Sequence, residues 1–155
     1  MQLGVTATPL VDEEFVLVAS AELAARLPLD RLAAEGPGVL GDVPMISYAE
    51  SLPIIRRYWH TVFDRSLTTP PALVIPDLRG ALAAVRSSAG ISVLPTYLCA
   101  EELADGTIVP LIEPEIPPPP PPLNTFYLAT RRGSAPHPDL TVLHGHLLMK
   151  AQLWI

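Results

Sequence analysis

The apolar positions between residues 76 and 95 recur at helical spacing and then run together as in a buried strand. The apolar residues three or four positions apart are Leu78, Ala81, Leu82 and Val85. Side chains at this spacing share one face of a helix. Asp77 precedes them and is suited to cap the first turn. Gly90 is expected to end the helix in the left-handed conformation, and residues 91–94 read as a strand inside an α/β sheet.

The same patterning predicts alternating strands and helices along the rest of the chain. We expect strands at residues 13–19, 45–48, 73–75, 107–112 and 125–131, and helices at residues 21–27, 29–34, 51–63, 96–103 and 138–150. Ser51 is expected to cap the helix at residues 51–63, and Gly106 is expected to close the helix at residues 96–103. Strands that alternate with helices imply an α/β fold with a mainly parallel sheet.

Bulk composition indicates one folded domain. The chain has 155 residues, of which 49% are hydrophobic, and this is enough to bury a single core. No uninterrupted apolar run reaches about 18 residues, so we expect no contact with a membrane. The start lacks the basic and apolar regions of a secretory signal. A lone cysteine, Cys99, fits a reducing compartment, and we expect a cytoplasmic location.

Charge argues against DNA binding by this chain alone. The formal net charge is −6, with Lys150 as the one lysine and nine dispersed arginines. A duplex-binding surface needs clustered cations to neutralise phosphates. The six prolines at residues 117–122 predict a stiff, extended connection. Such a run can also be a ligand for an aromatic groove, but a spacer is favoured because the run lies between two expected strands of one domain.

Motifs for catalysis or cofactors find little support. Residues 36–41 match the glycine pattern of a dinucleotide site, but they lack the strand before and the helix after that such a site needs. His144 and His146 would point about 200° apart on a helix and cannot share a metal. Cys99 lies among Ala and Leu, so a buried, inert thiol is expected. The acidic cluster at residues 12–14 is expected to be solvated. We expect no enzyme, no cofactor and no metal.

Three strand-to-helix junctions are the candidate binding positions. In an open α/β sheet, ligands lie beyond the carboxyl ends of the strands, against helix N-termini whose free N–H groups favour anions. The candidate site residues are Ser47, Tyr48, Glu50, Ser51, Asp77, Leu78 and Thr96. Alternatively, Ser51, Asp77 and Thr96 cap only their own helices. The first interpretation predicts a small anionic metabolite as ligand.

Residues 76–98 resemble part of the effector-binding domain of LysR-type transcriptional regulators. In that family a helix rich in Ala, Leu and Val ends in Ala-Gly-x-Gly-(Ile/Val)-x-(Leu/Val)-Leu-Pro. Residues 88–90 read Ser-Ala-Gly here, so one glycine position differs. Residues 8–20 are similar to the family's strand that leads into its second subdomain, and residues 123–131 are similar to its late return strand.

This resemblance implies a periplasmic-binding-protein-like (type 2) effector domain. Residues 1–19 would be a crossover strand from a missing first subdomain, residues 20–95 the second subdomain, and residues 96–155 a segment returning to the first. The loop at residues 47–51 would line the effector cleft. The strands at 107–112 and 125–131 and the final helix would lack their usual sheet partners, which predicts exposed edges and apolar surface and favours a homo-oligomer. DNA would be bound only through a helix-turn-helix that this chain does not carry.

Three alternatives remain beside effector sensing by such a regulator. A two-lobed solute-binding protein would have the same architecture, but the expected absence of a signal argues against it. A small α/β enzyme needs a paired nucleophile and base, and the sequence offers no candidate pair. A non-binding, truncated remnant would only associate with itself, and a ligand screen would separate it from a sensor.

Overall fold

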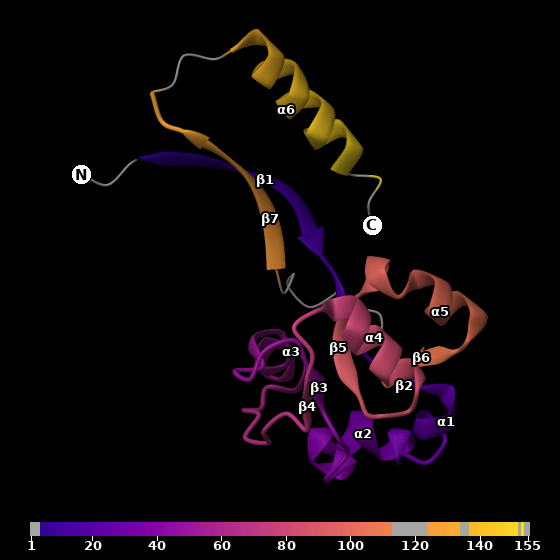
Figure 1. Cartoon of the computed structure of the whole chain (residues 1–155). Coiled ribbons are helices and arrows are strands. Elements are labelled where there is room, and N and C mark those ends of the chain that lie inside the picture. Colours follow the sequence, from indigo (N-terminus) through magenta and orange to yellow (C-terminus); the bar gives the residue numbers. More distant parts are fainter. Residues whose placement is uncertain (1–3, 113–123, 134–136, 152, 154–155) are drawn as a thin grey trace.

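The computed structural model describes residues 4–112, 124–133, 137–151 and 153. It consists of an α/β body, formed by residues 15–112, and a two-stranded ribbon that extends from the body and carries the last helix (Figure 1). The proline run lies outside the described residues. The ribbon is formed by β1 (Val5–Glu13) and β7 (Asn124–Arg131), and it is followed by α6 (Pro138–Ala151).

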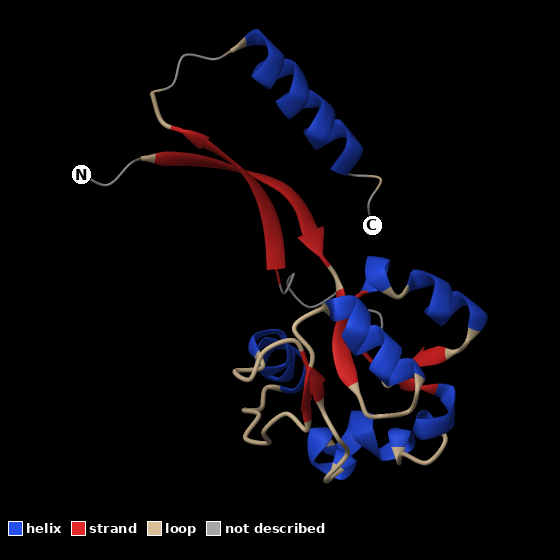
Figure 2. Ribbon diagram, viewed as in Figure 1, coloured by secondary structure: helices blue, strands red, loops and turns tan. Residues whose placement is uncertain are grey.

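The body alternates short strands with helices (Figure 2). Its strands are β2 (Phe15–Ser20), β3 (Ile46–Ser47), β4 (Leu73–Val74), β5 (Ser92–Pro95) and β6 (Ile108–Pro110). Its α-helices are α1 (Ala21–Ala24), α2 (Leu29–Glu35), α3 (Pro53–Phe63), α4 (Leu78–Arg86) and α5 (Ala100–Asp105). Two 3-10 turns complete it, η1 (Pro37–Leu40) and η2 (Thr96–Leu98).

Strand β2 is the middle strand of the three-stranded sheet in the body, and its direction is opposite to that of both neighbours. It pairs antiparallel with both β5 and β6, whereas β3 pairs parallel with β4 and a parallel bridge joins Met45 to Ile91. The prediction of a mainly parallel sheet is therefore wrong for β2. The reason is that β2 enters directly from the ribbon, whereas β5 and β6 each follow a helix. β6 lies in the segment that was predicted to lack its usual sheet partners, and within this chain it pairs with β2.

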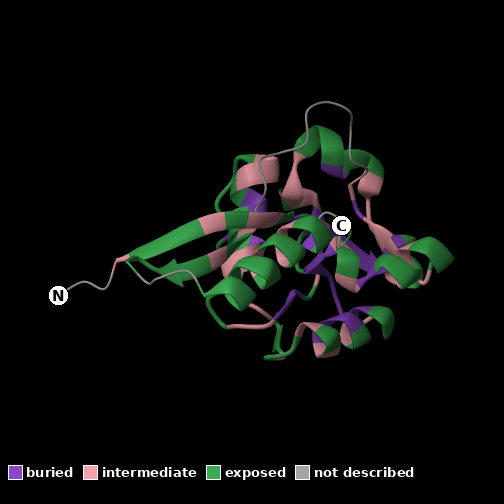
Figure 3. Ribbon diagram, turned by 90° about the horizontal axis from the view of Figure 1, so that it is seen from above, coloured by how far each residue is buried: buried purple, intermediate pink, exposed green. Residues whose placement is uncertain are grey.

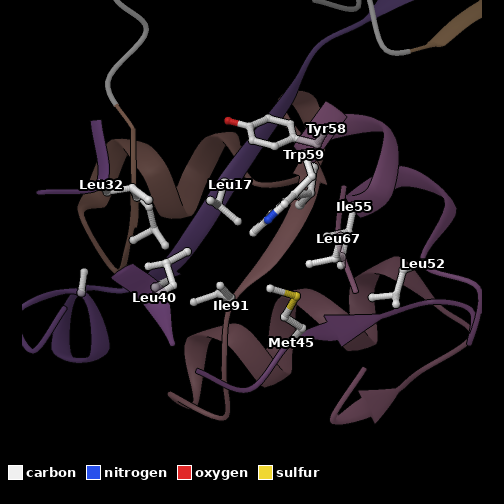
Figure 4. Close-up of a cluster of buried hydrophobic side chains, with 14 residues drawn as sticks. Leu17, Leu32, Leu40, Met45, Leu52, Ile55, Tyr58, Trp59, Leu67 and Ile91 are labelled. Atoms are coloured by element: carbon white, nitrogen blue, oxygen red, sulfur yellow. The ribbon is translucent and has the colours of Figure 1, made fainter. Parts of the chain in front are cut away.

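Successive residues of β2 anchor two apolar clusters on opposite faces of the sheet. Leu17, 1% exposed, packs in a cluster with Trp59 and other residues of α3, as Figure 4 shows. Val18, fully buried, belongs to a second cluster with Val85 of α4. Adjacent side chains of a strand point to opposite faces, so one strand fixes a helix on each side. Each such burial contributes about 1.5–3 kcal/mol.

Helix α4 forms as its apolar stripe predicts, but its end differs from expectation. Asp77 caps it by accepting a hydrogen bond from the backbone N–H of Arg79 at 2.8 Å. Ser88, with φ of 64°, takes the left-handed conformation that was expected of Gly90. Gly90 is required for another reason. A Cβ atom there would lie 2.2 Å from the carbonyl oxygen of Pro44, which accepts a bond from the N–H of Ile91 at 2.9 Å.

The predicted ends of two other helices, α3 and α5, agree with the structure only in part. Gly106 ends α5 in the left-handed conformation, with φ of 76°, as predicted. Ser51 does not cap α3, because the cap position is Leu52, with φ of 50°, and Pro53 begins the helix without a side-chain cap. The helix expected at residues 96–103 is divided into η2 and α5.

Most residues of the ribbon and α6 are exposed, as the green colour in Figure 3 shows. Several of them are large apolar residues. β1 pairs antiparallel with β7, so the strand predicted at residues 125–131 has a partner within the chain. The prediction of exposed apolar surface is confirmed: Val142 is 73% exposed and Leu140 is 63% exposed. Within the described part of the chain, no helix has the length and apolar character needed to cross a bilayer.

We expect Gly90→Ala to lower the free energy of unfolding by about 1–3 kcal/mol, because the added methyl group must displace backbone atoms. Urea unfolding followed by circular dichroism measures this. Gly38→Ala is the matched control, since nothing lies within 4 Å of the Cβ it would gain. Equal stability of the two variants would contradict the close approach to Pro44.

Candidate binding site

A groove with a volume of about 130 Å³ lies where the ribbon meets the body. It is lined by Phe15, Tyr48, Pro53, Ile54, Arg57 and Asn124. Drug-sized sites have volumes of roughly 300–1,000 Å³, so this groove fits a small molecule or part of one.

The fold brings these residues to one edge of the sheet. Tyr48 follows the carboxyl end of β3. Phe15 begins β2 and pairs with Pro95 at the carboxyl end of β5, so the antiparallel direction of β2 places its first residue at that same edge. Three lining residues come from the first turns of α3: Pro53, Ile54 and Arg57. The groove therefore forms at the edge where open α/β sheets bind ligands.

The groove combines apolar walls with groups that bind anions. Phe15 and Tyr48 supply aromatic surface, and Arg57 supplies a guanidinium with five N–H donors in a planar fork. The side-chain amide of Asn124 adds neutral donor and acceptor groups. This set suits a small ligand with a carboxylate at one end and apolar atoms at the other.

Glu13 lies beside the groove and differs from the solvated cluster expected at residues 12–14. It is 6% exposed. Its Oε1 accepts a hydrogen bond from the Tyr97 hydroxyl at 2.8 Å, and its Oε2 accepts one from the Asn124 amide. Burial raises the pKa of Tyr97 to about 12, and the hydrogen bond and negative charge of Glu13 act in the same direction. Asp12 and Glu14 are exposed, as expected.

Four of the residues predicted for the site lie at the first junction, after β3. Tyr48 lines the groove. Ser47 is 3% exposed, and its hydroxyl donates to the carbonyl of Ala49 at 2.7 Å, so it stabilises the local turn. Glu50 and Ser51 are exposed and are not among the lining residues. Of this junction, therefore, Tyr48 is the residue in the groove.

The remaining predicted site residues serve neighbouring structure. Asp77 caps α4. Leu78 packs half-buried against the second apolar cluster. The backbone N–H of Thr96 donates to the carbonyl of Glu14 at 2.9 Å, and η2 begins without a side-chain cap. Of the three residues that were weighed as caps, Asp77 alone has that role.

Five of the lining residues were not predicted from the sequence: Phe15, Pro53, Ile54, Arg57 and Asn124. The helical spacing in the sequence indicates that three of these residues lie close together. Arg57 follows Pro53 by four positions and Ile54 by three, so these side chains share one side of a helix. Asn124 carried no comparable signal, because it lies opposite Glu13 through a pairing between strands distant in sequence.

The described residues include neither a reactive thiol nor a cluster of side chains suited to a metal ion. Cys99 is fully buried, and its Sγ lies 3.3 Å from the carbonyl oxygen of Pro95. Burial raises the pKa of this thiol to about 11, so it is the inert cysteine that was expected. Within residues 4–112, 124–133, 137–151 and 153, no cluster of three or more His, Cys, Asp or Glu could hold a metal ion.

The family of the chain follows from its sequence. A family profile described as the LysR substrate binding domain matches residues 2–152, so the chain belongs to the LysR substrate-binding-domain family. This confirms the resemblance found in residues 76–98 and the periplasmic-binding-protein-like α/β fold class. The family consists of effector-binding domains of transcriptional regulators, which are not enzymes.

Individual relatives agree with this assignment. The HTH-type transcriptional regulator AbaB of Streptomyces antibioticus is 40% identical over 149 residues, which are 96% of this chain and 48% of AbaB. The C-terminal domains of a LysR family protein from Agrobacterium tumefaciens align with a TM-score of 0.74 and 23% identity, over 97% of this chain and 67% of that one.

A further solved structure is full-length LysG from Corynebacterium glutamicum with bound effector Arg. It aligns with a TM-score of 0.67 and 19% identity, over 96% of this chain and 47% of LysG. At these identities the two solved structures establish the fold alone. The chain spans about half the length of AbaB and of LysG.

We expect Cys99 to react slowly with a disulfide reagent in the folded protein. With a pKa of about 11, about one thiol in a thousand is ionised at pH 8. The rate should rise as pH increases toward 11. Because folding favours the neutral thiol, its contribution to stability is present below the ordinary pKa and declines as pH rises through the raised value. Stopped-flow labelling measures the rate, with the urea-unfolded chain as control, and equal rates for the two would contradict burial of the thiol.

Proposed function

We propose that the groove binds a small metabolite bearing a carboxylate and that the chain is the effector-sensing part of a LysR-type transcriptional regulator. The observation that carries the proposal is that Arg57 lines the same groove as the aromatic residues Phe15 and Tyr48 and the amide of Asn124. A guanidinium recognises a carboxylate through paired hydrogen bonds. Family membership supports sensing over a solute-binding protein or a non-binding remnant.

The proposal extends to the class of ligand, to the response of the regulator and to its contact with DNA. LysG is described with arginine bound as its effector, and an amino acid carries the carboxylate that Arg57 would bind. We propose that the ligand shifts the arrangement of two subdomains within a cytoplasmic homo-oligomer. DNA would be contacted through a helix-turn-helix outside these residues. The division of the chain at residues 19/20 and 95/96 stays a prediction, as do the roles of Glu50, Ser51 and Thr96 toward a ligand.

Calorimetric titration with a panel of small carboxylates, including L-arginine, succinate and benzoate, tests the proposal. For a compound that binds, we expect Arg57→Gln to weaken affinity by about tenfold to a hundredfold, the cost of a charged hydrogen bond. Arg56→Gln is the matched control, because the adjacent exposed arginine is not among the lining residues. Tyr48→Leu should weaken binding as well, through loss of the aromatic wall.

Two outcomes would reject the proposal. Equal loss of affinity in Arg56→Gln and Arg57→Gln would mean that charge acts at long range and not in the groove. Absence of heat and of thermal stabilisation for every compound of the panel would favour the non-binding alternative.

A further inference from the structure

The side chain of Glu13 makes hydrogen bonds at the junction between the ribbon and the body. It is the last residue of β1 and is nearly fully buried. One carboxylate oxygen accepts a hydrogen bond from Tyr97, in η2 of the body, at 2.8 Å. The other accepts a bond from Asn124, the first residue of β7 in the ribbon. One carboxylate therefore bridges three segments that are distant in the sequence.

The groove lies at this same junction. Asn124 belongs to the ribbon, whereas the other lining residues belong to the body. A rotation of the ribbon against the body would therefore move one wall of the groove relative to the other. On the body side the connection is anchored, because the carbonyl of Glu14 accepts a bond from the N–H of Thr96. The hydrogen bond between Glu13 and Tyr97 also joins the ribbon to the body, so it opposes such a rotation.

The energetics favour one angle between ribbon and body. A buried carboxylate oxygen without a donor costs more than a typical hydrogen bond contributes. The two described donors to Glu13 come from opposite sides of the junction, so both oxygens are satisfied only when ribbon and body are correctly placed. Tyr97 is 50% exposed as a residue, but its hydroxyl faces the buried carboxylate. With its pKa at about 12, this phenol remains a donor at neutral pH.

We propose that Glu13 is a positioning residue that locks the angle between ribbon and body and so sets the width of the groove. Its importance for ligand binding rests on the proposed function, because that function assigns the ligand to the groove. The lock itself is defined by contacts within the chain and does not require a ligand.

The test measures the angle directly in the full chain without ligand. Spin labels are placed at Ala83→Cys on α4 of the body and at Thr130→Cys on β7, both of which are exposed. Native Cys99 is buried and reacts slowly. Electron-electron resonance then gives the distribution of distances between the labels. Tyr97→Phe removes the bond between body and ribbon but keeps the bond of Glu13 to Asn124, so the distribution should broaden and its mean should shift.

Tyr127→Phe is the matched control, because this exposed tyrosine of β7 has no described hydrogen bond. Its distribution should coincide with that of the parent chain. Glu13→Gln, which keeps the size of the side chain and one oxygen acceptor, should give an intermediate width. If the distributions of Tyr97→Phe and Glu13→Gln both coincide with the parent, the lock is refuted. If Tyr97→Phe does not fold, as judged by circular dichroism, Glu13→Gln alone decides.

The two proposals fail separately. A broadened distribution in Tyr97→Phe, together with no binding of L-arginine, succinate or benzoate to the parent chain, would leave the lock in place and remove the proposed function. Ligand binding that depends on Arg57, together with unchanged distributions in Tyr97→Phe and Glu13→Gln, would support the function and refute the lock.

Discussion

The structure depends on strand β2 and on the opposite directions of its adjacent side chains. Leu17 and Val18 lie in different apolar clusters, on different faces of the sheet. The same strand pairs with β5 on one side and β6 on the other. The six residues of β2 therefore connect the helices on both faces of the sheet with two neighbouring strands. The first of these residues, Phe15, also lines the groove. A change that shifted the register of β2 by one residue would exchange its two faces and disturb core and groove together.

Local patterns predicted most of the elements because each depends on neighbouring residues. The stripe that includes Leu78 and Val85 predicted α4, Asp77 predicted its start, and Gly106 predicted the end of α5. Predictions failed where distant backbone decides. Gly90 is needed because Pro44 approaches it, and spacing along the chain does not reveal that contact. The direction of β2 depends on its direct connection to β1, which a periodicity of two within a strand leaves open.

The candidate site was predictable in part for the same reason. Tyr48 was found because it follows a strand and precedes a helix, which is the usual position of ligand-binding residues in this fold class. Arg57 was not predicted, because it lies outside the apolar face of α3 that Ile55, Tyr58 and Trp59 form. Glu13 and Asn124 meet only after β1 and β7 have paired. Glu13 and Asn124 could therefore not be predicted as neighbours from the sequence, whereas Tyr48 could be placed because its position depends on nearby residues.

The exposed apolar side chains of α6 have a consequence for the thermodynamics of the whole chain. Val142, Leu140 and Met149 place apolar side chains in water, and water contact with such area is unfavourable. Any molecule that covers this helix in the native state but not in the unfolded state shifts the folding equilibrium by mass action. Melting temperatures of this chain would then depend on its own concentration and on what accompanies it in solution, and a single value would describe one mixture rather than the polypeptide.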